Sequence, residues 1–208
     1  MDADDCREAM VQCLLKEHER LVRSEHETER ITEYFAGVGW GWALMEAGVE
    51  TYSEAARRRH PGLLNWCGIG VGWAGLQVGY HLPGGQCRPV RLDPKIAKHV
   101  LPSTYRADKR ADDPEHWAQA GHAPPDRPDD IRRGDIICIV TGAGKEYGDH
   151  FAMVVEVDGD DIHTVEANGY GRRGDGTEGR GVVRTVRKRE DVRRTIRLTD
   201  EHFEVVEI

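Results

Sequence analysis

The sequence lacks the features that define several common protein classes. Aromatic residues make up only 7% of the 208 residues, and no apolar stretch is long enough to cross a membrane. Residues 1–5 are acidic and no apolar segment follows them, so a standard secretory signal peptide is not expected. The net charge of −8 disfavours general binding to nucleic acid, because phosphates would be repelled. We therefore expect a chain made in the cytoplasm that neither binds nucleic acid nor inserts into a membrane.

Cysteine usage also excludes two classes of small domain. The chain has five cysteines, an odd number without regular spacing, and no pair has the C-x-x-C spacing. A disulfide framework and a zinc ribbon are therefore not expected, and no metal or organic cofactor is predicted. Cys138 lies in an apolar run that is typical of a core strand. Cys67 is the cysteine whose surroundings suggest chemistry.

The predicted elements divide the chain into a helical part and a strand-rich part. Helical patterns cover 5–36, with a possible break where Ser24 and Glu27 form a capping box, then 42–59 and a glycine-rich buried segment at 63–80. Residues 106–130 read as a surface loop or a short helix with a loop. Alternating patterns predict strands at 136–141, 150–157, 162–168, 182–187 and 193–198, with a glycine-rich loop at 169–181.

Helices followed by antiparallel strands predict an α+β fold. We expect a helical extension at 1–36 and one catalytic domain at 37–208, a size that suits a single core. Arginines are frequent between residues 172 and 197. A solvated strand face explains them most simply, and a rim that meets an anionic polymer is the alternative.

Thiol catalysis requires a thiolate, a histidine that exchanges protons with it, and a group that orients the histidine. Cys67 lies near the start of the predicted buried helix, where the helix dipole favours a thiolate. His150 begins a predicted strand. Glu166 and Asn168 lie two residues apart on the next strand, so both are candidates to orient the imidazole.

Four short motifs occur in an order that resembles the CHAP and NlpC/P60 amidohydrolases. They are Asn65-Trp66-Cys67-Gly68, Gly134-Asp135-Ile136, Gly148-Asp149-His150-Phe151-Ala152 and Glu166-Ala167-Asn168. The likeness covers roughly residues 30–200. It implies a papain-like fold in which the nucleophile helix packs on an antiparallel sheet. It also implies Cys67 as nucleophile, His150 as base, Glu166 as the residue that orients the histidine, and Asn168 as support for the histidine or the oxyanion.

Two features depart from the family pattern. Gly68-Ile69-Gly70-Val71 follows the cysteine where the family has an alanine-like residue and an aromatic, and Asp149 separates Gly148 from His150. Both suggest a divergent branch, such as a phage lysin or an antibacterial toxin. Trp66 and Trp117 are candidate substrate contacts, with packing in the core or a lid as the alternative.

The resemblance implies a cysteine peptidase or amidase that hydrolyses peptidoglycan peptides. It would be delivered to the cell wall, periplasm or exterior by lysis or specialised secretion, and a cognate immunity or delivery protein is an implied partner. Two alternatives remain. The first is a cytoplasmic cysteine peptidase or deamidase that acts on a protein or small amide. The second is an inactive papain-like binding module.

Overall fold

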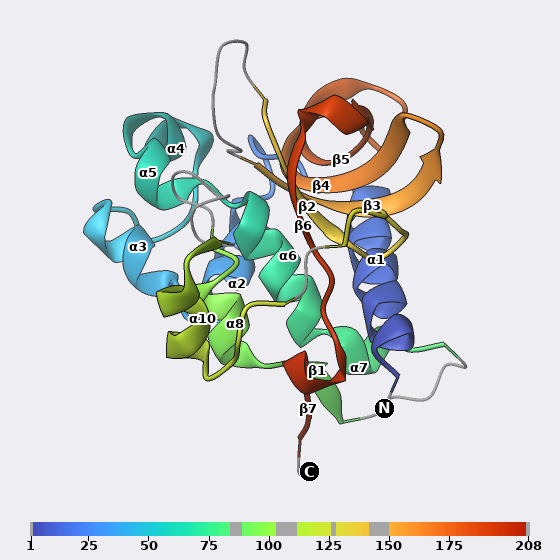
Figure 1. The fold of residues 1–208 in the computed structure, drawn as a ribbon. Helices are drawn as coiled ribbons and strands as arrows, with labels where there is room; N and C mark the ends of the chain where they lie inside the picture. Colours follow the sequence, from blue (N-terminus) through green and yellow to red (C-terminus); the bar gives the residue numbers. More distant parts are fainter. Residues whose placement is uncertain (1, 84–88, 103–111, 126–127, 142–149, 207–208) are drawn as a thin grey trace.

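The computed structural model describes residues 2–83, 89–102, 112–125, 128–141 and 150–206, with helices gathered beside a curved sheet (Figure 1). Its helices are α1 (Ala3–Glu19), α2 (Thr28–Gly37), α3 (Gly41–Glu46), α4 (Glu54–Arg59), α5 (Pro61–Leu64), α6 (Cys67–Leu76), α7 (Val78–His81), α8 (Pro94–His99) and α10 (Pro114–Ala120). The strands of the main sheet are β2 (Ile136–Ile139), β3 (His150–Asp158), β4 (Asp161–Arg172), β5 (Glu178–Lys188) and β6 (Val192–Ile196).

The main sheet has five strands in the order β5-β4-β3-β2-β6, and every neighbouring pair is antiparallel. A second sheet pairs β1 (Val90–Leu92) with β7 (Phe203–Val205). The last strand of the described chain therefore lies beside a strand from its middle. These two short strands were not predicted. Helices with antiparallel sheets confirm the α+β class.

The β4–β5 hairpin is longer than the sequence pattern predicted. The glycine-rich segment 169–181 was expected to be a loop, but β4 continues to Arg172 and β5 begins at Glu178. Gly169 pairs with Gly181, and Tyr170 with Arg180. Glycines without side chains allow the strands to bend here, with a register shift between Glu166 and Gly169.

The first helical run is divided by a segment that pairs with the sheet. Leu21 adopts a left-handed φ of 61°, which ends α1, and α2 begins at Thr28. The predicted capping box at Ser24 and Glu27 is therefore wrong: Ser24 is buried and lies before the helix. Its backbone N–H instead donates to the carbonyl of Arg180 at 3.2 Å, and the N–H of Val182 donates to the carbonyl of Val22 at 2.9 Å. Residues 22–24 thus cover part of the β5 edge.

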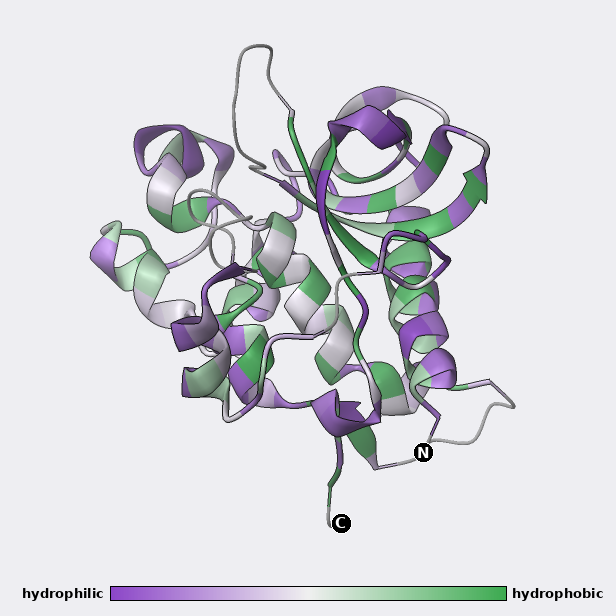
Figure 2. Ribbon diagram, viewed as in Figure 1, coloured by the Kyte–Doolittle hydropathy of each residue, from purple (hydrophilic) through white to green (hydrophobic). Residues whose placement is uncertain are grey.

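Helix α1 is amphipathic, and its apolar face joins the main core. Figure 2 shows hydrophobic and hydrophilic residues alternating along it. Its buried side includes Cys6, Met10, Cys13 and Leu14, which share one hydrophobic cluster with α6 and the sheet. Residues 1–36 were expected to be an extension, but their described helices belong to the same core as the remainder of the chain.

Helix α6 lies at the centre of the fold and is buried over Cys67–Gly75 (Figure 1). The sequence predicted one buried segment at 63–80, whereas the structure has three short helices. The break falls at Asn65, whose backbone is extended, with φ −73° and ψ 127°. Similarly, the helical pattern at 42–59 contains α3 and α4 with a break between them. The first break makes Cys67 the first residue of α6.

The glycines of α6 allow its neighbours to approach closely. A Cβ atom added at Gly68 would lie 1.7 Å from the carbonyl oxygen of Leu101, and one added at Gly70 would lie 2.4 Å from the Cβ of Ala167. Real carbon atoms cannot approach so closely, so these positions require glycine. The close approach places the start of α6 directly against β4.

We expect Gly70→Ala to lower the free energy of unfolding by about 1–3 kcal/mol, because the new methyl group would overlap Ala167. Gly62→Ala in the neighbouring helix α5 is the matched control, since a Cβ there meets no atom within 4 Å. Urea unfolding of both variants measures the difference. Equal stability of the two variants would contradict the proposed packing.

Candidate functional site

Three of the predicted site residues meet at the junction of helix α6 and the sheet. Cys67 begins α6, His150 begins β3, and Glu166 lies on β4. All three are almost completely buried. The side chain of His150 interacts with both of the others, so a thiol, an imidazole and a carboxylate form a continuous series.

His150 connects the thiol to the carboxylate. Its Nε2 donates a hydrogen bond to Oε2 of Glu166 at 2.9 Å, and its side chain also hydrogen-bonds to Cys67. Burial lowers the pKa of His150, but the charges of Cys67 and Glu166 and their hydrogen bonds outweigh burial and raise it to about 9. At neutral pH the imidazole is therefore protonated beside the sulfur. This is the charge state that stabilises a thiolate.

Glu166 is held by three donors and has no exposed side-chain surface. Besides His150, Arg187 donates from Nε to Oε1 at 2.7 Å and from Nη2 to Oε2 at 2.6 Å, and Thr164 donates to Oε1 at 2.7 Å. Burial raises the pKa of Glu166, whereas the hydrogen bonds from Arg187 and the charge of His150 lower it to about 2. The carboxylate is thus ionised and fixed in orientation.

Sequence reasoning did not identify Arg187 or Thr164 as site residues. Arg187 was grouped with the other C-terminal arginines as part of a solvated face. Its position opposite Ile162 on the β4–β5 hairpin places it on the same face as Glu166. A correct prediction of the hairpin register would have placed Arg187 on the face of Glu166. The glycine-rich segment was interpreted as a loop, so this register was not predicted.

Asn168 occupies a different position from Glu166 despite the spacing of two. It has a left-handed φ of 56° and lies within the irregular part of β4. Its Nδ2 donates to Oδ1 of Asn65 at 3.1 Å. Of the two candidates to orient the histidine, Glu166 contacts His150, whereas Asn168 joins β4 to the turn before Cys67.

The two tryptophans predicted as substrate contacts lie in the core. Trp66 and Trp117 have no exposed surface and belong to the main hydrophobic cluster. Trp66 packs against Tyr34 and Tyr52, with ring centroids 5.8 Å and 6.3 Å apart, respectively, and Trp117 packs against His202 at 5.5 Å. Packing, the alternative expectation, describes both residues, and neither lines the cavity that contains Cys67.

The start of α6 provides donors as well as the thiol. Within the helix, the N–H of Gly70 bonds to the carbonyl of Trp66, whereas the N–H groups of the first residues have no intrahelical acceptor. Helix N-termini carry partial positive charge, so the backbone beside Cys67 favours an anion. A thiolate and a developing oxyanion both benefit from this location.

A cavity of about 370 Å³ opens onto the sulfur. Its lining includes Cys67, His150, Asn168, Tyr170 and Arg180. A small molecule that enters the cavity would meet the otherwise buried side chain of Cys67. Residues 142–149, which include Gly148 and Asp149 of the third motif, fall outside the described part of the chain.

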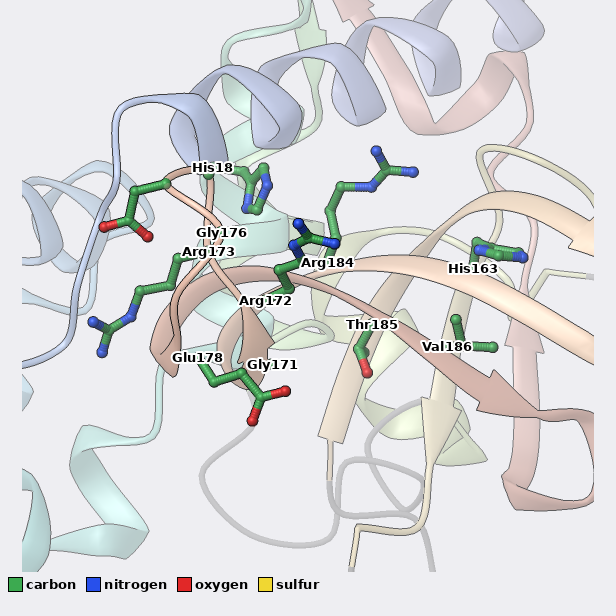
Figure 3. Close-up of a pocket in the computed structure, with 12 residues that line it drawn as sticks. His18, His163, Gly171, Arg172, Arg173, Gly176, Glu178, Arg184, Thr185 and Val186 are labelled. Atoms are coloured by element: carbon green, nitrogen blue, oxygen red, sulfur yellow. The ribbon is translucent and has the colours of Figure 1, made fainter.

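A larger cavity of about 740 Å³ lies elsewhere, between α1 and the β4–β5 hairpin (Figure 3). His18, Arg172 and Arg184 line it, and Figure 3 shows them gathered beneath the end of α1. It contains neither Cys67 nor His150. We assign the reactive site to the smaller cavity because that cavity contains the interacting cysteine, histidine and carboxylate.

Two further properties of the described residues bear on function. They contain no cluster of three or more His, Cys, Asp or Glu residues arranged to hold a metal ion. Among the helices described, none combines the length and the apolar character needed to span a bilayer.

Comparisons with known proteins give little further information. No protein-family model matches the chain, and no curated protein matches its sequence. One solved structure, described as "The crystal structure of Ly7917", is similar over 91% of this chain, with 16% sequence identity and a TM-score of 0.35. The chain spans 61% of the length of that protein.

The His150 titration tests the charge state of the site. The raised pKa means that protonation stabilises the folded state fully below about pH 6.5, and that this contribution is lost as the pH rises through about 9. We expect the NMR signal of the His150 ring to titrate near pH 9, and at lower pH in Glu166→Gln. A midpoint at or below 6.5 in the wild type would refute the ion pair.

Removing Arg187 tests the support of Glu166. We expect Arg187→Met to lower the free energy of unfolding by about 3–5 kcal/mol, because it removes the arginine that pairs with the buried carboxylate of Glu166. Arg184→Met, at an exposed position of the same strand, should change stability by less than about 0.5 kcal/mol.

Adding Glu166→Gln to Arg187→Met removes the stranded charge and should restore part of the stability. Chemical denaturation measures all three variants. Similar stabilities for Arg187→Met and Arg184→Met would show that the ion pair contributes little.

Proposed function

We propose that the protein is a papain-like cysteine amidohydrolase that cleaves an amide bond in peptidoglycan peptides. The observation that carries the proposal is the interaction of His150 with both Cys67 and Glu166 at the start of helix α6. Nucleophilic thiol catalysis requires these three groups, and the cavity gives a substrate access to the sulfur.

The geometry supports a two-step reaction. The Cys67 thiolate attacks the amide carbonyl, and backbone N–H groups at the start of α6 stabilise the oxyanion. His150 protonates the leaving amine, which gives an acyl-enzyme. Neutral His150 then takes a proton from water, the resulting hydroxide attacks the thioester, and the acid product and thiolate are released. Glu166 holds the imidazole in position and stabilises its charged form.

The choice of substrate rests on the resemblance of the four motifs to the CHAP and NlpC/P60 enzymes, which suggests a divergent lysin or antibacterial toxin. The complete set of paired charges favours an active enzyme over the alternative of an inactive binding module. A buried imidazole and carboxylate, paired with a partly exposed arginine, would be costly to retain in a protein that performs no chemistry.

Digestion of purified sacculi tests the proposal. We expect the wild-type protein to release muropeptide fragments, with masses that identify the cleaved amide, and Cys67→Ala to release none. Arg184→Gln, which lies outside the reactive cavity, should cleave like the wild type. If no fragments form from several wall chemotypes while Cys67 remains reactive, the substrate is a protein or small amide instead.

A further inference from the structure

The lining of the reactive cavity is strongly biased in charge. Among its described residues, none has a carboxylate side chain, whereas His150, Arg180 and Arg187 are cationic. Arg187 is neutralised by its two hydrogen bonds to Glu166. His150 is paired with Cys67 and Glu166. Arg180 is therefore the cation of the lining that these pairs do not neutralise.

The position of Arg180 is fixed by its backbone. It lies opposite Tyr170 in the β4–β5 hairpin, so the two side chains share one face of the sheet. Its carbonyl accepts the N–H of Ser24 at 3.2 Å, which joins it to the segment that covers the β5 edge. Residues 22–24 therefore hold the backbone of residues 180–182, beside the cavity.

The guanidinium of Arg180 retains most of its donors. Its Nη1 donates to the carbonyl of Asn168 at 3.2 Å, and within the described part of the chain no carboxylate forms an ion pair with it. Glu54 is near enough for the charge of Arg180 to affect its pKa. Burial raises the pKa of Glu54, but the hydrogen bonds from Arg57 and the charges of Arg57 and Arg180 outweigh burial and lower it. Glu54 nevertheless accepts hydrogen bonds from Nε and Nη2 of Arg57, at N–O distances of 2.6–3.1 Å, and not from Arg180.

We propose that Arg180, together with Tyr170, binds a carboxylate next to the scissile amide, so that the enzyme acts on acidic peptides. This inference rests on the proposed role of Cys67 as nucleophile. A planar guanidinium with free N–H groups matches a carboxylate in geometry. Tyr170 is 61% exposed and lines the same cavity, so its ring supplies an apolar surface for the adjoining substrate chain.

Two small alkylating reagents test the site without knowledge of the substrate. Iodoacetate and iodoacetamide form the same S–C bond with release of iodide, and they differ in charge. We expect Arg180→Gln to lower the iodoacetate-to-iodoacetamide rate ratio at Cys67 on the order of tenfold, the effect of losing a charge-assisted hydrogen bond. The iodoacetamide rate should stay unchanged, and Arg180→Lys should keep part of the preference.

Arg184→Gln on the same strand is the control, since Arg184 lines the other cavity and should leave the ratio unchanged. An unchanged ratio in Arg180→Gln would overturn the carboxylate site while leaving the nucleophile in place. The proposed function fails separately if iodoacetamide labels Cys67 no faster in the wild type than in His150→Ala.

Matched peptides extend the test once a cleaved bond is known. Two peptides that differ by glutamate or glutamine beside that bond should differ in kcat/KM on the order of tenfold for the wild type, with the acidic peptide preferred. In Arg180→Gln the preference should vanish through a slower reaction of the acidic peptide alone. Equal loss for both peptides would show that Arg180 supports the structure rather than recognition.

Discussion

The arrangement of the site depends on how closely helix α6 approaches the sheet. Gly70 lies against Ala167, and Gly68 lies against Leu101 and Phe151, at separations that a single added methyl group would prevent. On β4, Glu166 directly precedes Ala167, and on β3, His150 directly precedes Phe151. The packing of the helix therefore brings the thiol to the imidazole. Because glycine is a poor helix former, the same glycines lower the intrinsic stability of α6.

Charges of alternating sign run from the solvent side of the sheet to the thiol. Arg187, Glu166, His150 and Cys67 follow one another, and each group favours the ionised form of the next. Such a series is unfavourable to bury unless every hydrogen-bonding position is satisfied. Thr164 and Nε of Arg187 both donate to Oε1 of Glu166, so the orientation of the carboxylate is fixed by the protein itself.

Sequence patterns predicted the α+β class and the three residues that meet at the site, because these depend on local periodicity and on short motifs. They did not predict the break at Asn65, where tertiary packing of Trp66 overrides the helical tendency of its neighbours. They also missed Arg187 and the left-handed Asn168, since both depend on the register of a hairpin whose glycines resembled a loop. The two tryptophans were assigned to substrate because aromatic residues serve both recognition and cores, and sequence alone does not distinguish these roles.

The pairing of residues 22–24 with β5 has a consequence for the order of events during biosynthesis. The apolar face of helix α1 packs on α6 and α7, and also on strands that are made more than a hundred residues after it. At typical rates of synthesis this interval lasts about 10–30 s. During it, α1 can pack on α6 and α7 but not on the sheet, and contacts so distant in sequence form slowly. The reactive site therefore assembles only after Arg187 has been made, because the thiol depends on His150, Glu166 and Arg187 for its charged surroundings, and the helical part alone does not provide them.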